Sequence, residues 1–201
     1  MVKRGIIVLA VLTGLAASAA TSGAGVSSRA ATLPGMMIGS APWGPNDGAD
    51  LRARLKAIGL HALAVEGLKL HIHQHLDLAV NGRIYPVPAL IGINIEQRFL
   101  AEIHTHDDSG IIHVESPTVR TFTLGLFFDV WGLRFSEQCL GGYCAHGKKQ
   151  VMVWVNGKRI RTDPRKIVLR SHQEIVVAYG TRASLDPLGP IPKSYPFPRG
   201  Y

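Results

Sequence analysis

Between positions 70 and 80 the chain alternates between apolar and polar residues, which is the pattern of a β-strand that buries one face. The apolar face consists of Leu70, Ile72, Leu76, Leu78 and Val80. The polar face consists of His71, His73, His75 and Asp77. The dipeptide Asn81-Gly82 follows, and it is the strongest short signal for a hairpin turn. We therefore expect a hairpin whose return strand, residues 83–88, lies at a sheet edge because two prolines interrupt it.

A second hairpin is predicted from residues 100–106 and 111–116, which flank a four-residue turn. The length of this turn sets His104 directly across from His113, with His106 on the same face. Directly opposed Cβ atoms are about 4.5–5.5 Å apart. Two imidazoles at that spacing can reach one metal ion with bonds of about 2.0–2.1 Å.

The pattern also predicts two short helices. The first, over residues 47–58, has its apolar residues on one face and is followed by Gly59. The second begins after Thr123, which is a favourable N-cap, and runs through Trp131 to a stop at Gly132.

Three further strands are expected over residues 151–155, 158–161 and 174–179, with an Asn156-Gly157 turn between the first two. From residue 100 onward the order of elements is then β-β-α-β-β-β. This order resembles a β-grasp unit, a helix laid across a mixed sheet, over residues 100–181. The predicted fold class is α+β and mostly β: a hairpin-rich sheet with a β-grasp-like C-terminal part and one or two short helices.

Both ends of the chain differ in composition from this globular part. Residues 1–19 combine a basic start, an apolar run and small residues, the pattern of a cleaved signal peptide, with an uncleaved membrane anchor as the alternative. Residues 20–46 are rich in Ala, Ser, Gly and Pro and predict a flexible leader. Residues 182–201 hold five prolines and predict an extended tail that lies along the body or stays loose. Between them, residues 47–99 carry the first helix and the histidine-bearing hairpin, and residues 100–181 form the β-grasp-like part.

The formal net charge of +8 raises the question of a nucleic-acid partner. The basic residues are scattered without interleaved aromatic residues, and an export signal argues further against nucleic acid. We interpret the charge as a solvated surface suited to the cell envelope. The two cysteines, Cys139 and Cys144, are spaced for a short-loop disulfide in an oxidising compartment, and a thiolate metal site with His146 is the alternative.

Six of the nine histidines lie between positions 71 and 113, in two short strings. Imidazole is the commonest protein ligand for borderline divalent metals. The predicted metal ligands are His73, His75, His104, His106 and His113. Further ligands, or acceptors that orient the histidines, are predicted at His71, Asp77, Asp108 and Glu115. The remaining histidines, His61, His146 and His172, are isolated and predicted to be structural or surface residues.

The ligand types narrow the choice of metal. A blue-copper site needs a cysteine beside its histidines, and neither string has one nearby. Cu(I) favours thioether ligands, and few methionines remain once a signal peptide is removed. We therefore expect Zn(II) or Cu(II) in a site of histidines or of histidines and carboxylates, with Fe(II) or Ni(II) next.

Both strings share fragments with metalloenzyme motifs. The run His104-Thr-His106-Asp107-Asp108 resembles the His-x-His-x-Asp-His string of metallo-β-lactamase-like hydrolases, but a serine replaces the last histidine. The run His73-Gln-His75-Leu-Asp77 resembles the same string, and a leucine replaces the last histidine there. This run is also similar to the first-strand motif of amidohydrolases, whose barrel needs far more residues, and to the cupin motif without its following glutamate.

The two histidine strings, together with residues 110–117 and 122–132, also resemble a family of secreted bacterial proteins without an established function. The resemblance covers most of residues 68–181. It implies export and a common fold, but no reaction.

Three functions follow from these patterns. The first is an exported protein that binds a divalent transition metal for acquisition, buffering or delivery. The second is a metal-dependent hydrolase or oxygenase, with Asp77, Asp108 or Glu115 as general base beside an open coordination position. The third is an envelope interaction module without catalytic activity whose histidines respond to pH.

Overall fold

The computed structural model describes residues 32–201, so the predicted signal peptide and the first part of the predicted leader lie outside the described residues. Within the described part the fold is α+β and mostly β, as predicted, with three short helices. These are α1 (Asp50–Ala57), α2 (Leu124–Trp131) and α3 (Arg182–Leu185), accompanied by the 3-10 turns η1 (Pro164–Lys166) and η2 (Asp186–Leu188).

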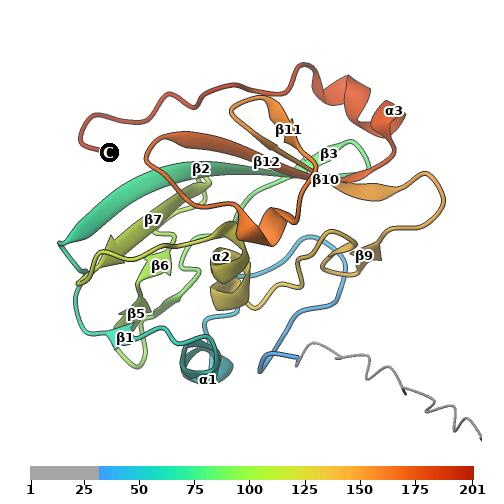
Figure 1. Cartoon of the computed structure of the whole chain (residues 1–201). Coiled ribbons are helices and arrows are strands. Elements are labelled where there is room, and N and C mark those ends of the chain that lie inside the picture. The colour runs from blue at the N-terminus through green and yellow to red at the C-terminus, as the bar shows by residue number, and fades with distance from the viewer. Residues whose placement is uncertain (1–31) are drawn as a thin grey trace, which may run out of the picture. The chain divides into compact units, whose positions relative to one another are not determined.

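A seven-stranded sheet has the order β11-β10-β12-β2-β7-β6, with β3 paired to the end of β2 (Figure 1). Its strands are β2 (Leu70–Val80), β3 (Arg83–Tyr85), β6 (Ile103–His104), β7 (Ile111–Ser116), β10 (Gln150–Val155), β11 (Lys158–Ile160) and β12 (Gln173–Gly180). A smaller sheet contains β1 (Ala62–Leu63), β5 (Phe99–Ala101) and β4 (Ile93–Asn94), and β8 (Cys139–Leu140) pairs with β9 (Tyr143–Cys144).

The central strand β2 joins the two halves of the chain. It runs parallel to β12 on one side and antiparallel to β7 on the other. Strands from residues 47–99 and from residues 100–181 therefore share one sheet. The β-grasp resemblance stays a prediction, and residues 100–181 alone lack the strand that links β7 to β12.

Turns and helix ends follow the chemistry of their sequence. Asn81 and Gly82 have φ angles of 49° and 83°, as a two-residue turn with both central residues at positive φ requires. At the start of α2 the Thr123 hydroxyl accepts a hydrogen bond from the Leu126 amide at 3.3 Å. Gly132 ends the helix with a φ of 70°. These predicted boundaries are confirmed.

Alternation along β2 gives the sheet two different faces. The predicted apolar face of β2 is confirmed, and its residues pack with those of α1 and α2 in the main core. The opposite face carries the odd-numbered residues and has a second, smaller apolar cluster formed by Ala79, Met152, Trp154, Val176, Ala178 and Leu185. The histidines of β2 lie on this second face.

The segment of residues 32–46, predicted to be part of a flexible leader, instead packs on the fold. Trp43 is buried and meets Trp131 and Tyr143 edge-on, with ring centroids 6.3 and 6.2 Å away. Its indole N–H donates to the Gly39 carbonyl at 3.0 Å. The buried tryptophan and backbone hydrogen bonds, such as that from the Gly142 amide to the Gly39 carbonyl at 2.6 Å, hold the segment on the fold.

The tail of residues 182–201 is only partly extended, so that prediction was wrong for its first residues. Thr181 accepts a hydrogen bond from the Ser184 amide at 3.0 Å and starts α3, which η2 follows. The rest of the tail runs along the second face of the sheet from α3 to the end of the chain (Figure 1). Its last residue, Tyr201, lies against the histidines.

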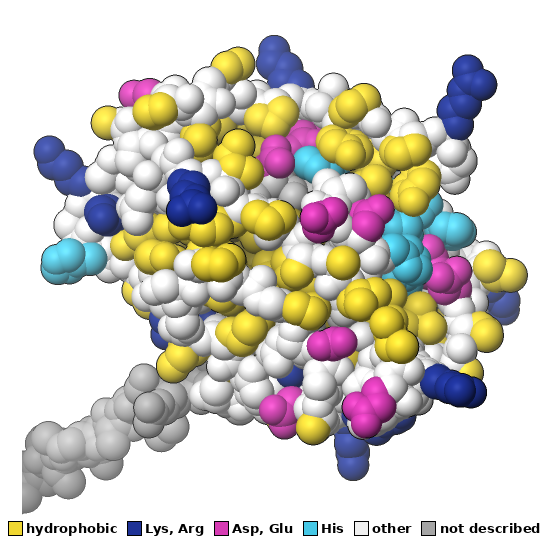
Figure 2. Space-filling view, turned by 180° about the vertical axis from the view of Figure 1, so that it is seen from behind, with side chains coloured by type: hydrophobic (Ala, Val, Ile, Leu, Met, Phe, Trp, Pro, Cys, Tyr) yellow, Lys and Arg dark blue, Asp and Glu magenta, His cyan; other side chains and the backbone are white. Residues whose placement is uncertain are grey.

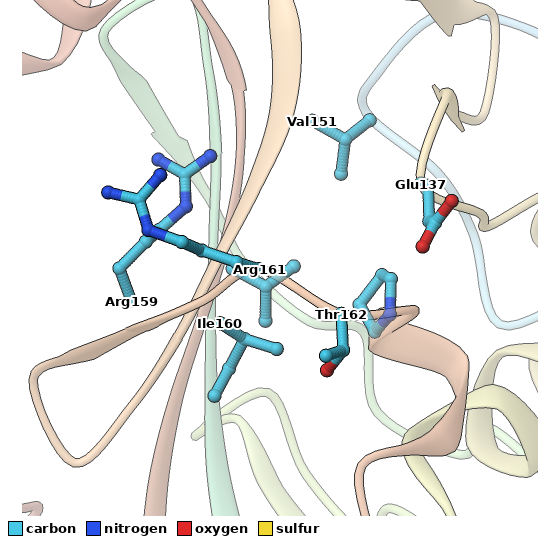
Figure 3. Close-up of a pocket in the computed structure, with 8 residues that line it drawn as sticks. Glu137, Val151, Arg159, Ile160, Arg161 and Thr162 are labelled. Carbon is cyan, nitrogen blue, oxygen red and sulfur yellow. The ribbon is translucent and has the colours of Figure 1, made fainter.

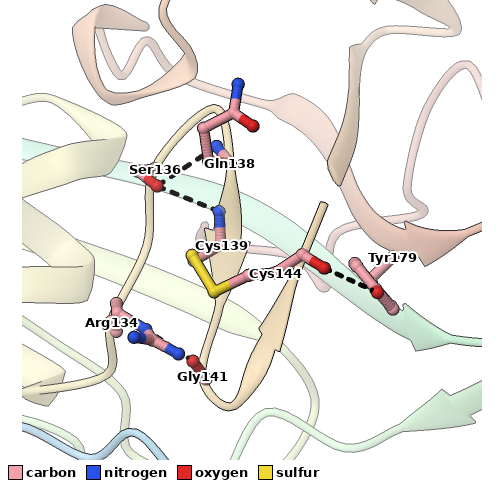
Figure 4. Close-up of a disulfide and its surroundings, with 7 residues drawn as sticks. All are labelled: Arg134, Ser136, Gln138, Cys139, Gly141, Cys144 and Tyr179. Carbon is pink, nitrogen blue, oxygen red and sulfur yellow. Dashed lines mark hydrogen bonds between the residues drawn. A yellow bond between two sulfur atoms is a disulfide. The ribbon is translucent and has the colours of Figure 1, made fainter. Parts of the chain in front are cut away.

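Cys139 and Cys144 form a disulfide across the β8–β9 hairpin, as predicted (Figure 4). The Tyr179 hydroxyl donates to the Cys144 carbonyl at 2.8 Å and ties the hairpin to β12. The alternative thiolate site with His146 is therefore wrong, because both sulfurs are in the disulfide. None of the helices within residues 32–201 has the length and apolar character of a membrane span.

Candidate metal centre

Three neighbouring strands bring the two histidine strings together. β6 sets His104 directly across from His113 on β7, and this predicted pairing is confirmed. β2 sets His73 across from the same His113, and His71 across from Glu115. Because directly paired side chains share a face of the sheet, the strings meet on its second face.

We call the result the histidine cluster, which consists of His71, His73, His104, His106, His113 and Glu115. Two groups within it have ligand atoms that all lie within 4.8 Å of one another. The first group is His104, His106, His113 and Glu115, and the second is His71, His73 and Glu115. Figure 2 shows histidine side chains gathered in one place on the surface, with acidic side chains beside them.

Ring nitrogens approach each other closely at two points of the cluster. The Nε2 atoms of His104 and His106 are 3.2 Å apart, and those of His71 and His73 are 3.1 Å apart. Two nitrogens bound tetrahedrally to one ion at about 2.0–2.1 Å are roughly 3.4 Å from each other. Each pair is therefore close to the spacing of two ligands on one metal ion.

The tautomer of His104 is set by the backbone. Its Nδ1 lies 2.9 Å from the Ala101 carbonyl oxygen, which can only accept, so Nδ1 carries the proton. Complete burial lowers the pKa of His104 to about 4, and its ring is neutral at physiological pH. The Nε2 lone pair therefore points to His106 and Glu115, as in a metal-binding histidine held by a carbonyl.

Glu115 is a buried carboxylate between the histidines. His113 Nδ1 donates to its Oε1 at 3.1 Å, and His71 Nε2 lies 3.3 Å from the same oxygen. Burial alone would raise the pKa of Glu115, but the bond from His113 and the surrounding histidines hold it at about 2. Its Oε2 is 3.8 Å from His104 Nε2 and accepts no hydrogen bond from the described part of the chain.

His73 and His106 complete the two nitrogen pairs in different surroundings. Burial, followed by the neighbouring His113 and His71, lowers the pKa of His73 to about 4. His106 is 40% exposed at its side chain, and its Nε2 lies 3.4 Å from a Glu66 carboxylate oxygen. The cluster is thus closed at His104 and open to solvent at His106 and His71.

His75, a predicted ligand, does not join the cluster. It forms a separate group with Asp77 and Glu174, which we call the His75 trio. Nδ1 of His75 lies 2.9 Å from Glu174 Oε2, and Nε2 donates to the Ser109 carbonyl at 3.0 Å. Burial raises the pKa of Glu174. Both nitrogens of His75 already have oxygen partners.

Among the other predicted residues, Asp77 lies with the trio and Asp108 is exposed in the turn before β7. Glu174 was missed by the sequence reasoning, because only the pairing of β12 with β2 shows that it faces His75. Tyr195 and Tyr201 were missed for a similar reason. The prolines predicted an extended tail, but nothing in them indicates where its aromatic rings lie.

The tail covers both groups with an aromatic ring. Tyr195 stacks on His75 with a centroid distance of 3.7 Å and an interplanar angle of 8°. The Tyr201 ring lies 4.7 Å from His73 and 5.5 Å from His113.

A further pocket of about 210 Å³ lies at the other edge of the sheet, beside Arg159, and no histidine lines it (Figure 3).

The comparisons with known proteins give no match: no family model, no curated protein and no solved structure matches the chain. The structure itself does show buried histidines and a carboxylate close enough to hold a metal ion. The chemistry of this cluster is therefore the best guide to function.

Proposed function

We propose that the protein is exported and binds a divalent transition metal, Zn(II) or Cu(II), at the histidine cluster, for acquisition, buffering or delivery of the metal. The observation that supports this most is the convergence of donors around His104. Its lone pair faces His106 Nε2 at 3.2 Å, and an unpartnered oxygen of Glu115 lies on the same side.

A bound metal ion would stabilise two buried acceptors that face each other, His104 Nε2 and Glu115 Oε2. A buried carboxylate and a buried neutral imidazole are acceptors toward each other, because neither has a proton to donate between them. Of the two, Glu115 Oε2 has no hydrogen-bond partner among the described residues, and leaving such a buried acceptor unpaired costs about 1–3 kcal/mol. A divalent cation between them accepts both lone pairs and offsets the negative charge of Glu115.

The donor set favours Zn(II) or Cu(II). The cluster offers imidazole nitrogens and carboxylate oxygens, and both cysteines are held in a disulfide far along the sequence. Imidazole suits Zn, Cu, Fe and Ni, while thiolate would favour Cu(I) or an iron–sulfur cluster. We place Zn(II) and Cu(II) first because a site of imidazoles and carboxylates without thiolate or thioether ligands suits both ions, with Fe(II) and Ni(II) next.

Export rests on two features of different kinds. The disulfide between Cys139 and Cys144 indicates an oxidising compartment. The predicted signal peptide and the resemblance to secreted bacterial proteins agree with it. We propose the cell exterior or envelope as the place where the metal is bound, with the positively charged surface facing the envelope.

A metal-dependent hydrolase or oxygenase is the second candidate, and the open edge of the cluster favours it. His71 and His106 have exposed side-chain fractions of 47% and 40%, so an ion held there keeps a position toward solvent. A catalytic metal needs such a position for water or substrate. The test for this candidate is turnover of ester, amide or phosphoester substrates by the metal-loaded protein.

The direct test of binding is elemental analysis of the purified protein after incubation with Zn(II) or Cu(II) and desalting. We expect bound metal in the wild type and its loss in His104→Ala and in His113→Ala. The matched control is His146→Ala, an exposed histidine outside the cluster. Circular dichroism checks that each variant is folded. Unchanged metal content in both cluster variants would contradict the proposal.

A further inference from the structure

The histidine cluster holds more donors than one ion can use. Five imidazoles and the two oxygens of Glu115 converge, whereas Zn(II) in proteins takes four ligands in nearly all structural sites. The donors also fall into two groups, one with three histidines and one with two, that share Glu115 alone. Each of the two groups can therefore bind its own ion.

The two groups lie on opposite sides of the strand that carries Glu115. His104 belongs to β6, His71 and His73 belong to β2, and β7 runs between these two strands. Adjacent strands are about 4.7–4.9 Å apart, so β2 and β6 are separated by about twice that distance. The donors of the two groups are not all within 4.8 Å of one another, so an ion bound between the nitrogens of His104 and His106 does not coincide with one bound between those of His71 and His73.

Glu115 presents one oxygen to each side. Oε1 lies 3.3 Å from His71 Nε2, and Oε2 lies 3.8 Å from His104 Nε2. Oε1 accepts from His113 Nδ1 and keeps a second lone pair, because a carboxylate has about four acceptor sites. A carboxylate shared in this way suits two ions about 3.5–4 Å apart, the spacing of two-metal sites.

We propose that the cluster is a dinuclear centre in which Glu115 bridges two divalent transition-metal ions. The first ion binds His104, His106, His113 and Oε2 of Glu115. The second binds His71, His73 and Oε1 of Glu115. The second ion has three protein ligands and lies at the exposed edge beside His71, so its remaining position faces solvent. This inference rests on the proposed function, and it adds a second ion and the bridge.

The first test counts ions by native mass spectrometry of the chain titrated with Zn(II). We expect about two ions in the wild type and about one in His71→Ala, since that variant removes a ligand of the second ion alone. His71 is half-exposed, so its replacement leaves the fold intact. The double variant His71→Ala/His73→Ala removes both histidine ligands of the second ion and should also bind one. The matched control His146→Ala should keep two.

The second test detects the bridge with Cu(II). Two Cu(II) ions that share a carboxylate couple magnetically. The electron paramagnetic resonance signal of the wild type should therefore be weaker than that of two isolated Cu(II) ions. In His71→Ala the one remaining ion should give the full signal of isolated Cu(II). The variant Glu174→Gln, which alters the His75 trio, should leave both the count and the coupling as in the wild type.

Each outcome decides between the two proposals. Two coupled ions support the dinuclear centre. One ion with an uncoupled signal in the wild type overturns the dinuclear centre and leaves the proposed function in place. Two uncoupled ions overturn the bridge, and loss of one of them in Glu174→Gln would place it at the His75 trio. No bound ion overturns both proposals.

Discussion

The histidine cluster and the His75 trio lie on the same face of β2, yet their histidines have different partners. In the cluster, ring nitrogens face other ring nitrogens, and two pairs are 3.1 and 3.2 Å apart. In the trio, each nitrogen of His75 faces an oxygen, that of Glu174 at 2.9 Å and that of Ser109 at 3.0 Å. In the cluster Glu115 Oε2 accepts no hydrogen bond from the described residues, whereas in the trio both nitrogens of His75 have oxygen partners.

The neighbouring strands cause this difference. β7 sets His113 and Glu115 beside the first two histidines of the string, whereas β12 sets Glu174 beside His75. Alternating histidines on a strand therefore do not share a role merely because they share a face. Because a neutral imidazole has one N–H, His75 Nε2 donates to the Ser109 carbonyl and the lone pair of Nδ1 faces Glu174 instead of another imidazole.

The largest expected effect is stabilisation by metal, which separates the two regions directly. A ligand present at one hundred times its dissociation constant stabilises the folded state by about 2.7 kcal/mol. We expect this gain in thermal or urea unfolding of the wild type with Zn(II). It should vanish in His104→Ala and persist in Glu174→Gln.

A chelator provides the control, because it should return the wild type to the stability of the metal-free protein. Equal stabilisation of His104→Ala and the wild type would show that the ion binds elsewhere. A loss of stabilisation in Glu174→Gln would show that the His75 trio takes part in metal binding, and the contrast between the two regions would then fail.

The second prediction concerns the trio alone. Glu174→Ala leaves the buried Nδ1 of His75 without its oxygen partner. Because an unsatisfied buried polar group costs about 1–3 kcal/mol, the free energy of unfolding in urea should fall by that amount. The number of bound metal ions should not change. Glu174→Gln keeps an amide oxygen near His75 and should be destabilised less than Glu174→Ala.

Much of the fold could be predicted from local sequence. The turn at Asn81-Gly82 and the ends of α2 depend on residues next to each other in the chain, and both are confirmed. The pairing of His104 with His113 depends only on the length of one turn, and it is also confirmed. Such features are encoded within a few residues, so the sequence alone determines them.

The site as a whole depends on pairings between distant segments. The meeting of the two histidine strings requires β2 to lie beside β7, and the parallel pairing with β12 brings Glu174 to His75 across 99 positions of sequence. No local pattern specifies those neighbours. For the same reason the sequence placed His75 with the ligands and gave no position for Tyr201.

The third prediction tests whether the trio supports the cluster through the turn between β6 and β7. Gly110 in this turn has a φ of 85°, and a Cβ there would lie 2.7 Å from the Leu76 carbonyl oxygen and 3.0 Å from His75 Nε2. Gly110→Ala should destabilise the fold by about 1–3 kcal/mol, because strain and the clash add. It should also weaken metal binding severalfold, since His106 precedes the same turn.

Gly147→Ala is the matched control for Gly110→Ala. Gly147 also has a positive φ, 58°, but a Cβ there would meet nothing within 4 Å. The control should therefore show the backbone strain alone and leave metal affinity unchanged. If both variants bind metal as the wild type does, the trio does not position the cluster.

The smallest effects are expected from the two tail tyrosines, one on each region. Tyr195 stacks on His75, and an aromatic pair contributes about 0.5–1.5 kcal/mol beyond its buried area. Tyr195→Ala should therefore lower stability by about that much and leave metal release unchanged.

Tyr201 lies over His73 and His113, so Tyr201→Ala should instead speed the transfer of bound Zn(II) to a chelator. Stopped-flow absorbance of the chelator measures the rate of this transfer. The reverse result, with faster release in Tyr195→Ala only, would mean that the ion is held beside His75. Faster release in Tyr201→Ala alone would confine the metal to the cluster, because each ring covers the histidines of one region.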